Sequence, residues 1–332
     1  MKVIIPLAGF GSRMRPHTWS RAKPLLNVAG NTVIGHLLDQ MAAVTTEEVV
    51  FVVGYKGAEI EAWIREHYPY LNSHFVQQTE PLGQAHALWL CRDFMVGEVL
   101  VAFGDGIVKA DYTELPEAGA DVVMLVEEVA DPRLFGVVVV DEQRQVQRLI
   151  EKPDTQEHRL AVAGVHWFQN GRLLAQALDT VIREERKTKG EYYLADAYQV
   201  LLAQGAKIVT KSTTFWLDAG SPENILATNT RLLGLGYGSA EAIERSYAED
   251  FTVIPPVFLH ETAVIERAVI GPYTSIEAGA VIRDSIVRHS LIDAEAHIEN
   301  CILDTSLIGE RAQVQGQSLK LFVGDDGAVE LT

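Results

Sequence analysis

The chain has 332 residues, of which 48% are hydrophobic and 22% charged, and its formal net charge is −17. This length exceeds what one hydrophobic core usually covers, so two domains are expected. The acidic balance argues against a nucleic-acid partner, because phosphate backbones require a basic surface. No apolar run approaches the roughly 20 residues of a membrane span. Two cysteines, Cys91 and Cys301, are too few for a disulfide framework. A cytoplasmic protein without a membrane partner is expected.

The first 38 residues contain no acidic side chain, although an even distribution of the 45 acidic residues would place about five there. Their basic residues include Lys2, Arg13, Arg15, Arg21 and Lys23. A basic segment in an acidic chain is typical of a site for an anionic ligand. The apolar run before Gly9 is only about six residues long, so it predicts a buried first strand and not a signal peptide.

Up to about Leu235, short apolar runs rich in β-branched residues alternate with helical patterns. The expected strands cover residues 3–7, 49–53, 99–103, 122–126 and 137–140. The expected helices cover residues 32–44, 58–67 and 83–94. Such alternation predicts an α/β fold with a doubly wound, mixed but mostly parallel sheet. Ligands in such folds bind at the carboxyl ends of the strands.

The pattern changes after residue 236. A helical linker is expected over residues 237–256, and a second domain over 257–332. Aliphatic residues there recur with a spacing of six that slips twice, at Val264, Ile270, Ile276 and Ile282, then Ile286, Ile292 and Ile298, then Ile302, Ile308 and Val314. A period of six predicts about three coils of a parallel β-helix, in which these side chains point inward. A small β-sandwich with coincidental spacing is the alternative.

A glycine-containing motif follows the first expected strand. It reads Leu7-Ala8-Gly9-x-Gly11-Ser12-Arg13-Met14-x-Pro16-x-Thr18, with Lys23-Pro24-Leu25 after it. Glycines at the end of a strand let backbone N–H groups approach a phosphate closely. Arg13 offers a fork of donors for phosphate oxygens, and Lys23 a compact charge. The two glycines alone would be equally compatible with a turn, so the specificity lies in the longer motif.

The longer motif resembles the signature of the sugar-1-phosphate nucleotidyltransferase family, above all that of the glucose-1-phosphate thymidylyltransferases. Matching motifs continue in order over residues 1–229, and the six-residue repeats are similar to the left-handed β-helix of many longer members. The resemblance implies a Rossmann-like nucleotidyltransferase domain over residues 1–236 and an assembly or regulatory role for the β-helix. It implies Arg13 and Lys23 as catalytic residues. The implied nucleotide-binding residues at this loop are Leu7, Ala8, Gly9, Gly11 and Ser12.

The segment Gln78-x-x-Pro81-x-Gly83 resembles the family's nucleobase-binding loop. A glutamine amide is both donor and acceptor, so it can pair with the edge of uracil or thymine. Pro81 and Gly83 are also compatible with a simple turn before a helix.

The apolar run 100–103 ends in Gly104-Asp105, and Asp218 lies in a Trp-x-Asp-x-Gly motif at residues 216–220. The resemblance implies that Asp105 and Asp218 bind Mg²⁺, and that Asp105 is also catalytic. Carboxylates at the carboxyl ends of strands are typical metal ligands of α/β folds. Ser221 replaces the family's threonine, which is a mild departure.

Residues farther along resemble the family's sugar-phosphate pocket. The implied sugar-phosphate ligands are Gly136, Glu151, Lys152, Val162 and Glu191. His166 stands where the family often has tyrosine, so the sugar contact there is open. The resemblance leaves Asp196 with a helix-anchoring role. A packing role is expected for His86, Trp89 and Cys91.

The chain contains no nucleophile with an adjacent base, and none is required, because a sugar phosphate is itself an anionic nucleophile. The predicted reaction transfers a nucleoside monophosphate from a nucleoside triphosphate to a sugar 1-phosphate. Gln78 favours dTTP or UTP, with glucose 1-phosphate as the acceptor. Alternatives are a mannose-1-phosphate guanylyltransferase, a non-catalytic sugar-nucleotide-binding relative and a β-helix acyltransferase. A homo-oligomer is expected, because β-helix modules commonly associate along their flat sides.

Overall fold

The computed structural model describes residues 1–188 and 190–317, so the end of the predicted second domain lies outside the described residues. The chain divides into two compact units. One unit contains residues 1–26 and 31–225, and the other contains residues 27–30 and those from 226 onward. The division falls inside helix α7 (Pro222–Leu232), eleven residues before the predicted domain end at 236. The predicted extents of the nucleotidyltransferase domain (1–236), the linker (237–256) and the second domain (257–332) stay predictions.

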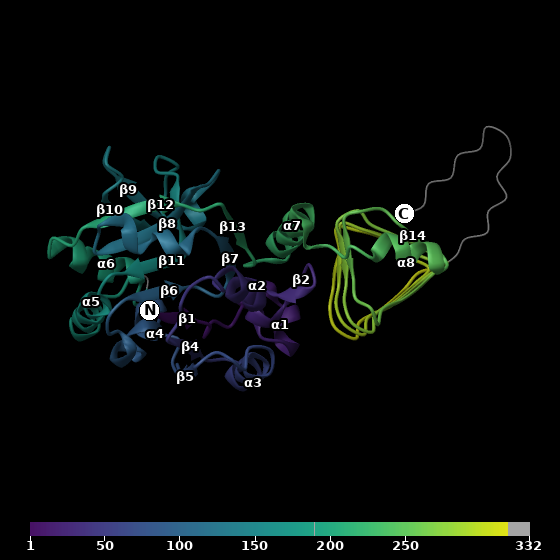
Figure 1. The fold of residues 1–332 in the computed structure, drawn as a ribbon, viewed down its shortest axis with the longest axis horizontal. Helices are drawn as coiled ribbons and strands as arrows, with labels where there is room; N and C mark the ends of the chain where they lie inside the picture. Colours follow the sequence, from purple (N-terminus) through teal and green to yellow (C-terminus); the bar gives the residue numbers. More distant parts are fainter. Residues whose placement is uncertain (189, 318–332) are drawn as a thin grey trace. The chain divides into compact units, whose positions relative to one another are not determined.

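The first unit combines strands and helices in alternation (Figure 1). Its strands are β1 (Lys2–Pro6), β3 (Asn31–Thr32), β4 (Glu48–Val53), β5 (Ser73–Gln77), β6 (Val99–Ala102), β7 (Gly106–Lys109), β8 (Val122–Glu128), β9 (Gly136–Val140), β10 (Val146–Glu151), β11 (Leu160–Phe168), β12 (Ile208–Ser212) and β13 (Phe215–Asp218). Its helices are α1 (His17–Ser20), α2 (Val33–Gln40), α3 (Gly57–His67), α4 (Gln84–Leu90), α5 (Gly171–Arg183) and α6 (Leu194–Ala203).

A nine-stranded mixed sheet forms the centre of this unit. Its main path runs β10-β9-β11-β6-β1-β4-β5, and β8 joins β11 to β12. Strand β1 pairs in parallel with both β4 and β6, whereas β11 runs antiparallel to β6, β8 and β9. The parallel strands β5, β4, β1 and β6 therefore end at one edge, where the sequence places Gly9, Gln78 and Asp105.

Both faces of the sheet are buried, which is why the parallel strands are almost continuously apolar. Along β1, Ile4 packs on one face together with residues of α4, α5 and α6. Val3 and Ile5 pack on the other face with residues of α2 and α3. The predicted α/β fold with helices on both faces is confirmed.

The second unit is a parallel β-helix built from three sheets. Each sheet stacks four short strands, all in parallel: β14-β17-β20-β23, β15-β18-β21-β24 and β16-β19-β22-β25. The strands are β14 (Phe251–Val253), β15 (Val257–Leu259), β16 (Val264–Glu266), β17 (Ala268–Ile270), β18 (Thr274–Ile276), β19 (Val281–Arg283), β20 (Ile286–Arg288), β21 (Leu291–Ile292), β22 (His297–Glu299), β23 (Ile302–Asp304), β24 (Leu307–Ile308) and β25 (Gln313–Gln315). Also in this unit are β2 (Asn27–Val28) and α8 (Ala242–Ala248), which falls within the expected linker. The predicted left-handed β-helix is confirmed, and the β-sandwich alternative is wrong.

The prediction of which aliphatic side chains point inward is partly wrong. Val264, Ile286 and Ile302 are 40%, 39% and 73% exposed. In each case the following residue points inward instead; Ile265 and Val287, for example, are at most 2% exposed. The cause is a shorter coil. Stacked positions are 17 residues apart in the first coil, as with Ile265 and Ile282, and 16 apart afterwards, as with Ile282 and Ile298, instead of 18. One or two sides of each triangle are therefore a residue short, and the inward phase shifts there.

Because Ile282 points into the β-helix and Ile302 points outward, the same substitution should have unequal effects at the two positions. Ile282→Ala removes a fully buried side chain and should lower the free energy of unfolding of the β-helix by about 2–5 kcal/mol. Ile302→Ala, at a position that is 73% exposed, should change it by less than about 0.5 kcal/mol. Urea titration followed by hydrogen exchange of the β-helix amides measures both. Equal shifts of the two midpoints would contradict the inward assignment.

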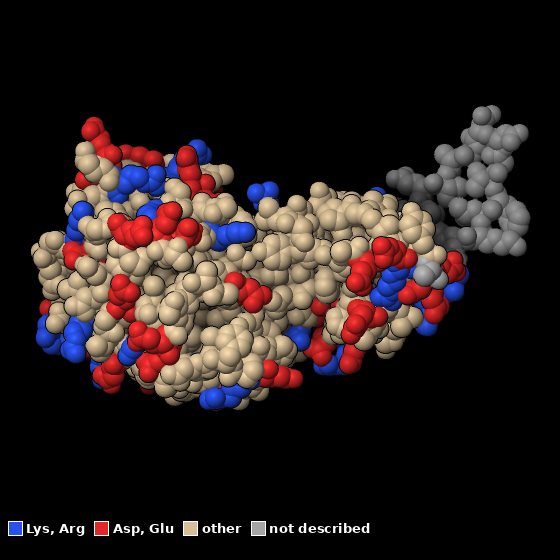
Figure 2. Space-filling view, viewed as in Figure 1, with Lys and Arg blue, Asp and Glu red and all other residues tan. Residues whose placement is uncertain are grey.

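Acidic and basic side chains are interspersed over the face drawn in Figure 2, and no continuous basic surface is visible among its described residues. Within residues 1–188 and 190–317, every helix is too short or too polar to cross a bilayer.

Candidate active site

The glycine motif forms a tight loop between β1 and a short 3₁₀ helix. Gly11 has a φ of 62°, in the left-handed region that favours glycine. A Cβ at Gly11 would lie 3.0 Å from side-chain atoms of both Thr18 and Lys23. The Thr18 hydroxyl donates a hydrogen bond of 2.9 Å to the Gly11 carbonyl. The loop is therefore packed closely against the segment that carries Lys23.

Side chains of the β4–α3 connection and of the first turn of α3 hold that segment by its backbone. The Tyr55 hydroxyl and the Lys56 ammonium donate to two carbonyls at 3.3 and 2.7 Å, and the Glu59 carboxylate accepts from an N–H at 3.3 Å. The backbone atoms concerned are Trp19 O, Ser20 O and Ala22 N. Lys56 and Glu59 also pair with each other at 3.4 Å. We call these three side chains the 55–59 clamp; they fix the chain just before Lys23.

A first cavity of 370 Å³ lies over this loop at the carboxyl ends of β1, β5 and β6. All eight predicted nucleotide-binding residues line it, together with three predicted catalytic residues: Leu7, Ala8, Gly9, Gly11, Ser12, Gln78, Pro81 and Gly83, with Arg13, Lys23 and Asp105. The glycine loop and two basic side chains thus line one cavity, which suits a polyphosphate.

Gln78 closes one part of the first cavity. Its side-chain nitrogen lies 3.2 Å from the Gly83 carbonyl and 3.0 Å from His86 Nδ1. Gly83 has a φ of 107°, and a Cβ there would lie 2.6 Å from the Tyr192 carbonyl, so only glycine fits. His86 stacks on Trp89 as the expected packing role requires, but its contact with Gln78 was not foreseen.

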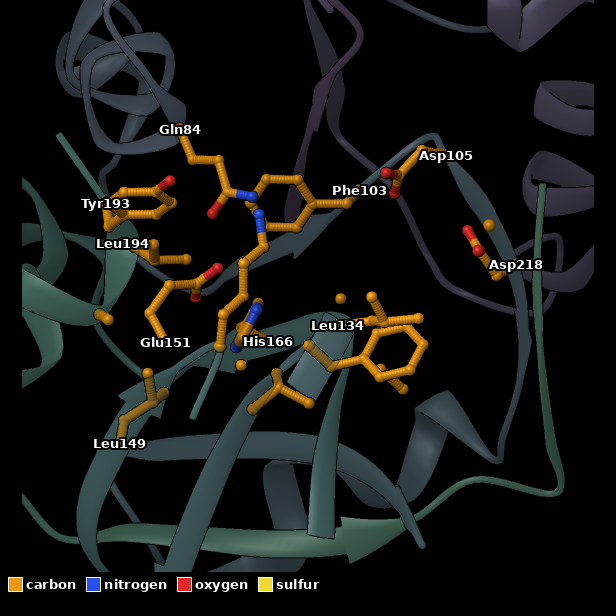
Figure 3. Close-up of a pocket in the computed structure, with 18 of the residues that line it drawn as sticks. Gln84, Phe103, Asp105, Leu134, Leu149, Glu151, His166, Tyr193, Leu194 and Asp218 are labelled. Atoms are coloured by element: carbon orange, nitrogen blue, oxygen red, sulfur yellow. The ribbon is translucent and has the colours of Figure 1, made fainter. Parts of the chain in front are cut away.

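The two aspartates come together on a short antiparallel ladder. Strand β13 pairs with β7 so that Asp218 lies opposite Gly106, and the Ala219 N–H donates to the Asp105 carbonyl at 3.1 Å. The Asp105 carboxylate lies 3.5 Å from the Lys23 ammonium, and the Asn224 amide donates to the Asp218 carboxylate. Both carboxylates line one cavity, and Figure 3 shows them at the same end of it.

This carboxylate pair fits a magnesium ion. Mg²⁺ is usually held by one or two carboxylates together with substrate phosphates and water, not by a full protein cage. Among the described residues, no group of three or more His, Cys, Asp or Glu side chains could hold a metal, so an ion on this pair would need further ligands from a substrate or water. The Asp105 side chain is 61% exposed, so its oxygens are accessible to an ion.

A second cavity of 270 Å³ adjoins the first. Every predicted sugar-phosphate ligand lines it: Gly136, Glu151, Lys152, Val162 and Glu191. A Cβ on Gly136 would lie 3.0 Å from the Glu151 carboxylate, so the glycine leaves that oxygen room. In Figure 3 the Glu151 carboxylate and Tyr193 lie at the end of the cavity away from Asp105 and Asp218. One end of the cavity therefore carries two carboxylates that would suit a metal ion, and the other end suits hydroxyl groups.

His166 lies on the floor of the second cavity on β11, where it is 3% exposed. Burial lowers its pKa from 6.5 to about 3, so the imidazole is neutral over the physiological range. Its Nδ1 lies 2.9 Å from the hydroxyl of the buried Tyr198. A tyrosine from α6, Tyr198, thus lines this cavity next to His166, although position 166 itself is a histidine.

The two cavities have five lining residues in common: Arg13, Gln84, Phe103, Asp105 and Glu191. A polyphosphate in the first cavity and a hydroxylated anion in the second would meet at Arg13 and Asp105. This arrangement suits transfer of a phosphoryl-linked group between two anions, with electrostatic stabilisation by the basic side chains.

Comparison with known proteins bears out this interpretation. Residues 2–234 match the family model described as nucleotidyl transferase. The chain belongs to the nucleotidyl transferase family. The resemblance inferred from the motifs, and with it the prediction of a nucleotidyltransferase, is confirmed.

Several curated nucleotidyl transferases are similar to the chain. A low-salt glycan biosynthesis nucleotidyltransferase of Haloferax volcanii is 32% identical over 70% of this chain and 66% of its own length. A glucose-1-phosphate thymidylyltransferase of Streptomyces griseus is 28% identical over 86% of this chain and 85% of its own. The bifunctional protein GlmU of Methanocaldococcus jannaschii is 30% identical over 70% of this chain, which spans about half (54%) of that relative.

A solved structure shares the fold of the nucleotidyl transferase unit. A Bacillus anthracis protein, described as a candidate glucose-1-phosphate thymidylyltransferase in complex with sucrose, superposes with a TM-score of 0.60. It is 24% identical to this chain and covers 69% of it and 94% of its own length. At this identity the likeness concerns the fold alone.

Sequence reasoning missed several residues that line the cavities. Gln84 and Phe103 lie between the two cavities, and Asn224 holds the Asp218 carboxylate. Gln84 directly follows the Gly83 turn and Phe103 ends an apolar run, so neither differs from ordinary turn or core residues. Asp196 lies in the first turn of α6, and its carboxylate accepts a hydrogen bond from Thr188, in line with the expected anchoring role.

Proposed function

We propose that this nucleotidyl transferase moves a nucleoside monophosphate from dTTP or UTP to glucose 1-phosphate, giving a nucleoside-diphosphate sugar and pyrophosphate. The observation that carries the proposal is the pair of cavities that meet at Arg13 and Asp105. Two relatives support the substrates: the Streptomyces griseus thymidylyltransferase, and a UTP–glucose-1-phosphate uridylyltransferase of Haloferax volcanii that is 29% identical over 93% of its own length.

The acceptor would bind in the second cavity. The Lys152 ammonium would hold its phosphate, while the Glu151 and Glu191 carboxylates accept hydrogen bonds from sugar hydroxyls. Binding the acceptor phosphate beside the first cavity would make the reaction between the two anions effectively unimolecular. No protein nucleophile is needed, because the acceptor phosphate supplies the attacking oxygen.

The donor triphosphate would lie along the glycine loop. An acceptor oxygen forms the new bond to the α-phosphorus, and the bond from that phosphorus to the bridging oxygen breaks with its electron pair going to pyrophosphate. Arg13 and the loop N–H groups would hold the departing pyrophosphate, and the Lys23 ammonium would offset charge near the reacting centre. Asp105 and Asp218 would hold Mg²⁺, which when bound supplies Lewis-acid stabilisation of negative charge on phosphate oxygens. A cytoplasmic location and a homo-oligomeric state stay predictions.

A substrate matrix tests the proposal. Pyrophosphate release is measured for dTTP, UTP and GTP against glucose 1-phosphate and mannose 1-phosphate, with MgCl₂ or with EDTA. We expect dTTP or UTP with glucose 1-phosphate to be the fastest pair by at least about tenfold, with no release in EDTA. The guanylyltransferase alternative would be supported by a preference for GTP and mannose 1-phosphate. Absence of release in every pair would favour the non-catalytic alternative.

A further inference from the structure

The Gln78 side chain is held in one orientation. It follows β5, is 9% exposed and lines the first cavity. Its amide nitrogen contacts the Gly83 carbonyl at 3.2 Å and His86 Nδ1 at 3.0 Å. A carbonyl oxygen can only accept a hydrogen bond, so the NH₂ side of the amide must face Gly83. The reversed amide would place two oxygens against each other.

His86 accepts a hydrogen bond from the second N–H of the Gln78 side-chain amide. Its Nδ1 must then accept, so the ring proton lies on Nε2. Partial burial lowers the pKa of His86 from its usual 6.5, against the opposing effect of the Glu80 carboxylate, and this favours the neutral ring. The imidazole is supported by Trp89, whose ring stacks on it at 6.0 Å. Both amide N–H groups of Gln78 are thus engaged inside the protein.

The amide oxygen remains for a ligand. Within residues 1–188 and 190–317, the side-chain amide of Gln78 makes hydrogen bonds through its nitrogen alone. Its oxygen is also absent from the buried polar atoms that lack a partner in this part of the chain, so it is accessible from the first cavity. Gln78 therefore presents an acceptor, although an unrestrained glutamine could present a donor or an acceptor by turning its amide.

We propose that His86 and the Gly83 carbonyl fix the Gln78 amide so that the site takes only nucleobases with a ring N–H on their pairing edge. Uracil and thymine carry this donor at N3 and guanine at N1, whereas cytosine and adenine carry an acceptor lone pair there. An acceptor facing an acceptor loses a hydrogen bond and leaves both groups unpaired. The inference rests on the proposed placement of a nucleoside triphosphate in the first cavity.

UTP and CTP form the sharpest pair of probes, because they differ only at N3 and C4 of the base. Binding of each to the full-length protein with MgCl₂ is measured by calorimetry, and turnover by pyrophosphate release. The wild type should prefer UTP by about 100-fold or more. In His86→Leu, and in His86→Phe if the leucine variant is unstable, the Gly83 carbonyl alone restrains the amide, so turning it costs one hydrogen bond and not two. The preference should then fall to about tenfold or less.

Two further variants separate orientation from packing. His86→Asn offers a side-chain oxygen as the acceptor and should restore most of the preference. Trp89→Leu removes the ring under His86 without touching the amide and should keep the preference, with a thermal midpoint measured as the fold control. A wild type that binds UTP and CTP equally, or His86→Leu and His86→Phe variants that keep the wild-type ratio, would overturn the inference.

These outcomes are distinct from those that test the proposed function. Turnover with GTP alone would contradict the pyrimidine preference but agree with the fixed acceptor. Absence of turnover with every pair would contradict the function, while the ratio of UTP to CTP binding would still decide the inference. Preferred use of CTP or ATP would overturn it directly.

Discussion

Asp105→Asn should lower the turnover of pyrophosphate release by about 10³-fold, which corresponds to about 4 kcal/mol in the barrier. The amide keeps the size of the carboxylate but removes the charge that would hold Mg²⁺ and that faces Lys23 at 3.5 Å. The side chain is 61% exposed, so the fold should persist with little change in thermal midpoint. Turnover measured over a MgCl₂ titration should show that saturating metal restores only a small part of the loss.

Asp111→Asn is the matched control. This exposed carboxylate on the following loop caps Thr113 and lines neither cavity. Its turnover should stay within about twofold of the wild type. Asp218→Asn should resemble Asp105→Asn, and the double variant should lose little more than either single one, because the two act as a unit. Near-normal turnover in Asp105→Asn would remove this residue from the proposed mechanism.

Arg13→Ala should lower kcat/KM for the triphosphate by about 10²–10³-fold. Arg13 lines both cavities, and its guanidinium and the Asp218 carboxylate both lie beside Gly220, where an added Cβ would be 3.0 Å from Arg13 Nη2 and 2.9 Å from Asp218 Oδ1. Arg13→Lys should recover only part of the rate, because an ammonium lacks the planar fork that two phosphate oxygens require. Steady-state kinetics with each substrate varied in turn measures both variants.

Arg15→Ala provides the comparison for charge alone. Arg15 is an exposed cation two residues away that lines neither cavity. If the basic character of the segment mattered more than the position of Arg13, the two alanine variants would lose similar activity. A loss at Arg13 below about fivefold would show that other groups hold the departing pyrophosphate.

The fold could be predicted from the sequence where the hydrophobic pattern is strong. The buried strands β1, β4 and β6 are mostly apolar runs, and the β-helix shows a regular repeat of aliphatic residues. The apolar pattern did not mark strand β11, because Gly164 interrupts its run, and its pairing register with β8 shifts between Val162 and His166. The edge strand β5 is mostly polar and was also missed.

The candidate site could be predicted where a motif is local. The glycine loop and the Gln78 segment each lie within a few residues of sequence, so a resemblance locates them directly. Asp105 and Asp218 are far apart in the sequence, and only the pairing of β7 with β13 brings them together. The contact of Gln78 with His86 depends on the start of α4 after the Gly83 turn, and no pattern in the sequence marks it.

The 55–59 clamp has a consequence for how a polyanion would enter the site. Its contacts lie within the protein chain, between side chains at the start of α3 or just before it and the backbone before Lys23. The backbone entropy of that segment, about 1–2 kcal/mol per residue, is then lost when the chain folds and not when a ligand arrives. Association would proceed onto a preformed surface and would not have to wait for a loop to become ordered, so this part of the protein favours selection of an existing conformation over induced fit.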